Sequence, residues 1–274
     1  MTVKPTPPLH RRRRIDAFAF DLDGTIYLGP SLLPGALALL SFLKDSGCPF
    51  VFVTNNSSVS GERYVRKLAD LGIVVDRQSV LTSNDVAAEH VRSLGLKAPV
   101  LVAVPEVEEE YRQRGFMPGA VSPDCVILTF DTTLTYEKLC QAARFIRRGL
   151  PYFATHPDLV CPTLDGPVPD CGSFIALLKA ATGVSPVLLG KPKKPMAEAV
   201  VQRCGAAPEA IAFVGDRLYT DIRLANDHAF FAVLTLTGEA SLEDIATSPF
   251  VPDLVVDSLE SLLGRLQRDG MLLS

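Results

Sequence analysis

Acidic side chains follow two short apolar runs of this chain, at positions where a buried strand would end. Asp21 and Asp23 follow one such run, and a second pair, Asp216 and Asp221, follows another near the C-terminus. Carboxylates are costly beside buried apolar segments unless they contact one another, a ligand or a metal. Several aspartates brought together would form a hard oxygen site, which prefers Mg²⁺ over zinc or copper. Because an aspartate beside such a cation can attack phosphorus, these residues favour phosphoryl transfer through an aspartyl phosphate.

A hydroxyl residue and a lysine follow two further apolar runs. Thr54 is followed by Asn55 and Asn56, and Lys191 comes directly after Gly190. A lysine and the backbone N–H groups of such turns can hold phosphate oxygens. A carboxylate two residues after the nucleophile could protonate the leaving group and later activate water. The sequence therefore contains each kind of group that phosphoryl transfer to water would need.

The apolar runs before these residues have the composition of buried strands in a parallel sheet. The expected strands span residues 15–20, 49–53, 100–104, 126–130, 152–155, 187–190, 211–214 and 231–234. Apolar residues at helical spacing between them predict helices at residues 34–46, 61–71, 85–94, 136–148, 172–182, 196–204 and 259–266. Strands that alternate with helices indicate right-handed βαβ units. Ligands bind outside the carboxyl ends of such strands, so the polar residues are expected to meet at one edge of the sheet.

The alternation of strands and helices starts again in the middle of the chain. Residues 83–185 lie between the second and third groups of polar residues and are numerous enough for a domain of their own. We therefore expect a discontinuous core, residues 15–82 and 186–274, with residues 83–185 inserted into it. Residues 1–14 are rich in Pro and Arg and are expected to form a solvated, disordered tail.

The composition of the whole chain argues against several other classes of protein. The 274 residues are 47% hydrophobic and 21% charged, which suits a soluble α/β protein, and the net charge of -4 argues against a nucleic-acid binder. No apolar run approaches the ~18 residues that a membrane span requires. The six cysteines form no close pairs and the four histidines are scattered. These features favour reduced thiols, a cytoplasmic location and no zinc site.

Taken in order, the four groups of polar residues resemble the signatures of the haloacid dehalogenase-like superfamily. The matching positions are Asp21, Asp23 and Thr25 for the first signature, Thr54 for the second, Lys191 for the third, and Asp216 and Asp221 for the fourth. The stretches Asp-Leu-Asp-Gly-Thr-Ile-Tyr-Leu-Gly, Thr-Asn-Asn-Ser-Ser and Ala-Thr-His-Pro-Asp are similar to those of the NagD-type and 4-nitrophenylphosphatase-like subgroup. The resemblance covers nearly all of the chain from residue 15 onward.

This resemblance implies a Rossmann-like, doubly wound parallel-sheet core with an inserted α/β cap domain of the C2 type. It implies a phosphatase with Asp21 as the nucleophile and Asp23 as the general acid and base. Mg²⁺ would be held by the Asp21 carboxylate, the Asp23 carbonyl oxygen and Asp216, with Asp221 in the outer shell. The groups implied to bind phosphate or substrate are the backbone near Leu22 and Asp23, and the side chains of Thr54, Asn55, Asn56 and Lys191.

The resemblance also bounds the substrate and the alternatives. The implied substrate is a small phosphorylated metabolite, such as a sugar phosphate, phosphoglycolate, a nucleoside monophosphate or pyridoxal phosphate, and a homodimer through the cap is plausible for the family. A phosphotransferase or mutase would share these residues but pass the phosphoryl group to a second hydroxyl, and a non-catalytic binding protein could keep the same core. The acid at Asp23 argues against true dehalogenases and transport ATPases, which lack an acid at this place.

Several residues of the predicted cap could face the site. His156 stands where many members of the subgroup have Asn, and Thr155, Asp158, Asp131 and residues 169–172 occupy nearby positions in the sequence. These residues could contact the substrate, or they could form a structural turn followed by the start of a helix. The sequence leaves both interpretations open. The departure at His156 concerns substrate choice rather than the chemistry.

Overall fold

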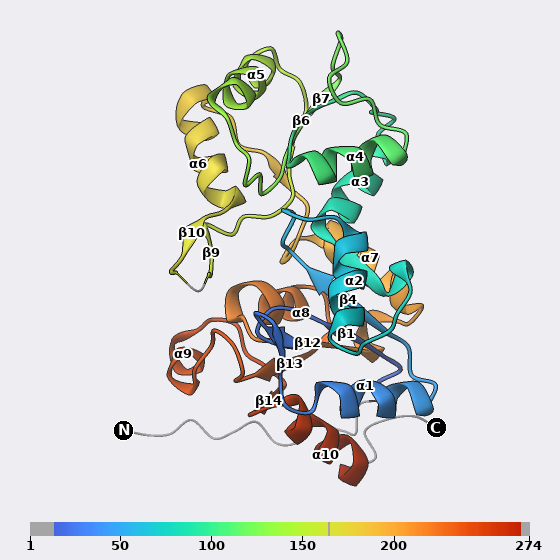
Figure 1. Cartoon of the computed structure of the whole chain (residues 1–274). Coiled ribbons are helices and arrows are strands. Elements are labelled where there is room, and N and C mark those ends of the chain that lie inside the picture. Colours follow the sequence, from blue (N-terminus) through green and yellow to red (C-terminus); the bar gives the residue numbers. More distant parts are fainter. Residues whose placement is uncertain (1–13, 164, 270–274) are drawn as a thin grey trace.

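The computed structural model describes residues 14–163 and 165–269 (Figure 1). In these residues a six-stranded parallel sheet has the strand order β14-β13-β12-β1-β4-β5. Its strands are β1 (Ala17–Phe20), β4 (Phe50–Thr54), β5 (Val80–Thr82), β12 (Ile211–Gly215), β13 (Phe231–Thr235) and β14 (Leu254–Val256). The chain runs outward from β1 to β4 and β5 on one side, and from β12 to β14 on the other. The order therefore reverses at the β1/β12 pair, the place where open α/β sheets bind ligands.

Both faces of this sheet are covered because side chains of the central strand alternate between two apolar clusters. In β1, Phe18 and Phe20 pack in one cluster, whereas Ala17 and Ala19 pack in the other. The helices that contribute to the first cluster are α1 (Ala36–Asp45), α2 (Gly61–Asp70) and α10 (Leu259–Asp269). Those that contribute to the second are α3 (Ser83–Ser93), α7 (Lys194–Cys204) and α8 (Arg223–Asp227). The predicted doubly wound parallel core is confirmed.

A second parallel sheet, with the order β11-β8-β7-β6, lies above the first in the view of Figure 1. Its strands are β6 (Pro99–Val102), β7 (Cys125–Leu128), β8 (Tyr152–Ala154) and β11 (Val187–Leu188), and its helices are α4 (Pro105–Gln113), α5 (Tyr136–Arg147) and α6 (Cys171–Thr182). A third apolar cluster joins this sheet to α5 and α6. The remaining strands and α-helix are β2 (Tyr27–Leu28), β3 (Ser31–Leu32), β9 (Val160–Cys161), β10 (Val168–Pro169) and α9 (Leu242–Thr247). Three short helical segments complete the fold, namely the 3₁₀-helices η1 (Arg77–Ser79) and η2 (Pro208–Ala210) and the π-helix η3 (Leu218–Ile222).

One strand was predicted for the wrong sheet. Residues 187–190 were expected to return the chain to the core, but Val187 and Leu188 pair with β8 in the four-stranded sheet. Val187 is 53% exposed, as suits the edge of a small sheet, whereas Leu189 is fully buried in a cluster shared with the core helices. The return to the core layer therefore begins at Leu189. The division of the chain at residues 83 and 185 stays a prediction.

Two predictions from composition concern the chain as a whole. All six cysteines are free, and four of them are buried. Within residues 14–163 and 165–269, no helix is both long and apolar enough to cross a membrane. The predicted N-terminal tail lies, apart from Arg14, outside the described residues.

Candidate active site

The polar residues predicted from sequence follow three adjacent strands of the larger sheet. Asp21 follows β1, Thr54 ends β4 and Asp216 follows β12, and β1 lies between the other two strands. Since the strands are parallel, their carboxyl ends meet at the same edge. The expectation that these residues share one edge of the sheet is confirmed.

Lys191 joins the first and last groups through two short ion pairs. Its ammonium lies 2.5 Å from Asp21 Oδ1 and 2.7 Å from Asp221 Oδ1, and its side chain is 3% exposed. Burial by itself would lower the pKa of Lys191, but the two carboxylates outweigh that effect and raise it. The lysine therefore stays charged at the centre of the site, where it can neutralise anionic oxygens.

Asp21, Asp216 and Asp221 form a group of three buried carboxylates. Each offers an oxygen within 4.8 Å of the others among the residues that the structure describes. Burial, together with the neighbouring carboxylates, raises the pKa of Asp21 well above its ordinary value and that of Asp216 to about 6. Asp216 Oδ2 accepts a hydrogen bond from the Glu239 N–H at 2.8 Å, whereas the buried Asp216 Oδ1 has no partner within the described part of the chain. An unpartnered buried carboxylate oxygen within such a group fits a divalent cation that prefers oxygen ligands, such as Mg²⁺.

Two glycines make room for the Asp216 carboxylate. A Cβ at Gly24, which has a φ of +86°, would lie 2.4 Å from Asp216 Oδ2, and a Cβ at Gly238 would lie 2.0 Å from the same oxygen. Neither distance is compatible with a methyl group. The position of Asp216 therefore depends on the absence of side chains at both residues.

Gly238→Ala is expected to weaken the binding of a divalent cation at this site by roughly tenfold, because the added methyl group must displace the Asp216 carboxylate. Calorimetric titration of each variant with Mg²⁺ measures the effect as a dissociation constant. Gly264→Ala in α10 is the matched control, since its Cβ would meet the flexible end of Arg268 at 3.3 Å. Equal dissociation constants for Mg²⁺ in the two variants would contradict the role given to Gly238.

The Asp23 side chain lies outside this group of three and is 47% exposed. The Tyr27 hydroxyl donates a hydrogen bond to Asp23 Oδ2 at 3.2 Å, and the Lys67 ammonium lies 3.8 Å from Oδ1 and 3.6 Å from the centre of the Tyr27 ring. Burial raises the pKa of Asp23 above its ordinary value, and Lys67 and Tyr27 oppose the rise. Sequence reasoning missed Lys67, because it lies 44 residues after Asp23 on a helix whose rotation the sequence does not reveal.

The residues after β4 are held by local partners. Thr54 Oγ1 accepts from the Asn56 N–H at 3.1 Å, and Asn56 Oδ1 accepts from the N–H of Ser58 at 2.9 Å. Asn55 Oδ1 accepts from the Lys191 N–H at 2.7 Å, and Asn55 Nδ2 donates to the Lys191 carbonyl at 3.1 Å. Both ends of the Asn55 amide thus hold the backbone of Lys191. Phosphate binding by these residues stays a prediction.

The predicted cap residues fall into two groups. Thr155, His156 and Asp170 belong to a buried hydrogen-bonded chain, with His156 Nε2 2.9 Å from Asp170 Oδ1 and Nδ1 3.0 Å from Thr155 Oγ1. Asp131 likewise is buried and pairs with Lys138 at 2.6 Å. These contacts support structural roles for these residues. Asp158 differs, because its Oδ2 accepts from Asn55 Nδ2 at 3.0 Å, next to the site.

Comparison with known proteins agrees with this geometry. Residues 18–117 match the model of a haloacid dehalogenase-like hydrolase family, and residues 188–262 match a second model of related hydrolases. The chain is 31% identical to the 5'-nucleotidase YutF of Bacillus subtilis (strain 168) over 88% of its own length and 95% of that protein's. It is 28% identical to an acid sugar phosphatase of Staphylococcus aureus (strain USA300), over 93% of its own length and the whole of the relative.

Solved structures of similar proteins share the fold over nearly the whole chain. A 4-nitrophenylphosphatase from Thermotoga maritima is 42% identical with a TM-score of 0.88, over 91% of this chain and 97% of the other. NagD from E. coli K-12 is 29% identical with a TM-score of 0.84, over 90% and 98%. The carboxylates and lysine at one sheet edge, together with these similarities, show that the chain is an enzyme of the haloacid dehalogenase-like hydrolases and belongs to their NagD-like phosphatases.

Proposed function

We propose that this enzyme hydrolyses a small phosphomonoester with the help of Mg²⁺, through a phosphorylated Asp21. The observation that carries the proposal is the buried Asp21 carboxylate, which lies 2.5 Å from the Lys191 ammonium and within the group of three carboxylates. A nucleophile, a fixed cation and a hard oxygen site thus meet where open α/β sheets bind their ligands.

The reaction has two steps. An Asp21 carboxylate oxygen forms a bond to phosphorus while the bond to the ester oxygen breaks, and Asp23 gives its proton to the departing alkoxide. Asp23 then takes a proton from water, whose oxygen bonds to phosphorus and releases Asp21 and inorganic phosphate. The half-exposed Asp23 carboxyl, outside the carboxylate group, supports this exchange of protons with the leaving group and with water. Lys191 offsets the negative charge on the phosphate oxygens, and Asn55 fixes the lysine's backbone.

The groups that would hold Mg²⁺ are the carboxylates of Asp21 and Asp216 and the carbonyl oxygen of Asp23. When bound, the cation reduces the repulsion between the anionic nucleophile and the phosphate and stabilises charge in the transition state. The unpartnered Asp216 Oδ1 supports direct contact between this residue and the cation. Asp221 suits a supporting position, because its Oδ1 pairs with Lys191 and its Oδ2 accepts from the Arg217 N–H at 3.1 Å.

We further propose a small phosphorylated metabolite as the substrate. The relatives named above act, by their names, on nucleotides, sugar phosphates and 4-nitrophenyl phosphate, and this range supports the general class of phosphomonoesters. A cytoplasmic location, an inserted cap formed by residues 83–185 and a homodimer through that cap stay predictions.

Mg²⁺ removal is expected to abolish phosphate release from a panel of phosphomonoesters, and restored Mg²⁺ is expected to return it. The physical reason is that three buried carboxylates and an anionic substrate repel one another without the cation. Free phosphate is measured with Mg²⁺, with EDTA, and with EDTA followed by excess Mg²⁺. Turnover unaffected by EDTA would contradict the metal site, and phosphate recovered on a second alcohol instead of in solution would identify a phosphotransferase.

A further inference from the structure

A cavity of about 680 Å³ opens beside Asp23, between helix α2 and the start of helix α4. Its charged lining consists of Arg63, Arg66, Lys67 and Asp70 from α2, together with Asp23 and Glu106. It does not include the three buried carboxylates of the catalytic group. Because Asp23 faces this cavity and is the acid proposed to protonate the leaving alcohol, the space adjoins the position of the leaving group.

Two of the three carboxylates of this lining, those of Glu106 and Asp23, already have partners. Glu106 accepts hydrogen bonds from the N–H and hydroxyl of Ser60 and pairs with Arg63 at 3.3 Å. Asp23 accepts from Tyr27 and lies 3.8 Å from Lys67. The exposed Arg66 side chain, in contrast, forms no hydrogen bond or ion pair with another described residue, although Asp70 stands four residues later on the same helix. The cavity therefore presents a guanidinium that a ligand can pair with.

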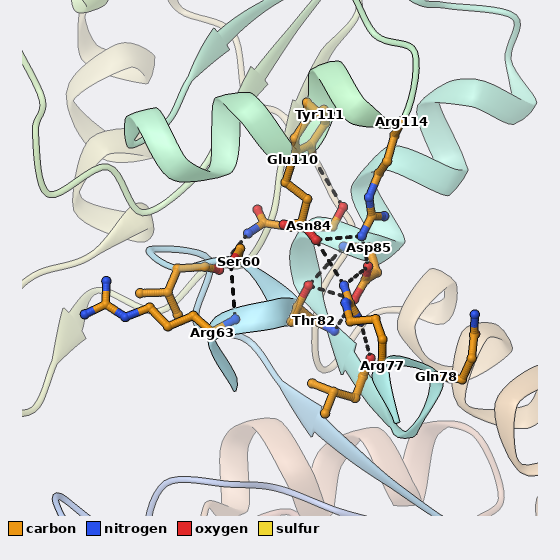
Figure 2. Close-up of polar contacts among 12 residues, drawn as sticks. Ser60, Arg63, Arg77, Gln78, Thr82, Asn84, Asp85, Glu110, Tyr111 and Arg114 are labelled. Atoms are coloured by element: carbon orange, nitrogen blue, oxygen red, sulfur yellow. Dashed lines mark hydrogen bonds and ion pairs between the residues drawn. The ribbon is translucent and has the colours of Figure 1, made fainter. Parts of the chain in front are cut away.

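The walls of the cavity are fixed by ion pairs next to it. Figure 2 shows Arg77 and Arg114 meeting Asp85 and Glu110 beside the N-terminal end of α2. Asp85 belongs to α3 and Glu110 to α4, so the pairs join the two helices, and the Ser60 contacts join α4 to α2. The helix that carries Arg66 is thus held in place, so the entropy lost when a ligand binds is limited to the ordering of the side chain and the ligand.

We infer that this cavity binds the leaving group of the substrate and selects one that carries a second anionic oxygen group, a carboxylate or a phosphate. Arg66 supplies the main charge for that recognition, because a guanidinium pairs with either group through parallel hydrogen bonds. The inference rests on the proposed function, since it uses Asp23 as the acid that faces the leaving group. It narrows the substrate class to phosphomonoesters that carry a carboxylate or a second phosphate in addition to the phosphate that is hydrolysed.

The test compares three esters on one three-carbon skeleton, namely glycerol 3-phosphate, 3-phosphoglycerate and glycerol 1,3-bisphosphate. Dissociation constants are measured with Mg²⁺ in the Asp21→Asn background, so that no ester is consumed. The second anionic group is expected to tighten binding by about fivefold, and Arg66→Gln is expected to remove that difference. Glu106→Gln is expected to enlarge this difference in affinity, because the substitution frees Arg63 from its ion pair while keeping an acceptor for Ser60. If 3-phosphoglycerate binds more tightly than glycerol 1,3-bisphosphate, the preferred second group is a carboxylate; the reverse order identifies a phosphate.

Arg144→Gln, at an exposed arginine in the last turn of α5, is the matched control and is expected to leave all three constants unchanged. Equal binding of the three esters, or equal effects of Arg66→Gln and Arg144→Gln, would overturn the inference. Hydrolysis of 4-nitrophenyl phosphate, which lacks a second anionic group, by the chain with Asp21 intact tests the proposed function separately. A result that contradicts anion binding in the cavity can therefore be distinguished from a result that contradicts the proposed hydrolysis.

Discussion

Asp21→Asn is expected to lower phosphate release by roughly four orders of magnitude or more, because a neutral amide cannot form the aspartyl phosphate. The substitution keeps the size of the side chain. Lys191 keeps Asp221 as a partner at 2.7 Å, so the buried ammonium is not left alone. The folded chain is therefore expected to persist, with a Tm near that of the unchanged enzyme. Phosphate release from 4-nitrophenyl phosphate and a thermal unfolding curve measure the two quantities.

Asp45→Asn provides the control for this result. Asp45 is an exposed aspartate at the end of α1, on a helix that does not contribute to the site, and its substitution is expected to leave both activity and Tm unchanged. Isolation of a phosphorylated Asp21 from the unchanged enzyme during turnover would identify the nucleophile directly. Full activity in Asp21→Asn would instead exclude this aspartate as the nucleophile.

Asp85→Asn is expected to destabilise the folded chain by about 2 kcal/mol or more, because it removes the more buried of the two carboxylates that pair with Arg77 and Arg114 and leaves them only Glu110. The Asp85 side chain is 2% exposed, pairs with Arg77 at 2.6 Å and also pairs with Arg114 (Figure 2). Its second oxygen accepts from the N–H and hydroxyl of Thr82, at 2.8 Å and 2.9 Å, in the capping box of α3. Equilibrium unfolding in urea measures the loss.

The matched control is Asp227→Asn, which breaks the exposed pair between Arg223 and Asp227. An exposed pair of this kind contributes at most about 1 kcal/mol, so the two variants are expected to differ clearly. Equal losses in both would mean that burial does not strengthen the Asp85 contacts.

The stability difference between the unchanged chain and Asp85→Asn is also expected to depend on pH. Burial by itself would raise the pKa of Asp85, but Arg114 and Arg77 outweigh it, and the pKa lies below its ordinary value. A carboxylate with a lowered folded-state pKa stabilises the fold above its unfolded-state pKa, which is about 4, and loses that contribution as the pH falls through the folded-state value. The difference is therefore expected to be constant near neutral pH and to shrink below about pH 4.

Local sequence patterns were sufficient to predict that Asp21, Thr54 and Asp216 lie at one edge of the larger sheet. Asp21 and Asp216 each follow a run of apolar residues, which becomes a strand buried on both faces, and such runs can be recognised without knowing their neighbours. Parallel strands place whatever follows them at one edge, so the meeting of these residues follows from the type of sheet. Short elements such as β5, with three residues, were missed because they give too little periodicity to recognise.

The sequence by itself determined which polar residues follow the central strands, since the apolar runs before Asp21, Thr54 and Asp216 specify both the strands and the edge of the sheet that these residues share. Tertiary structure alone decided what surrounds them. The pairing of β11 with β8, the approach of Lys67 to Asp23 and the cavity that contains Arg66 join residues that are distant in the chain. Such contacts depend on helix rotation and on which surfaces pack together, and no local pattern encodes either of these.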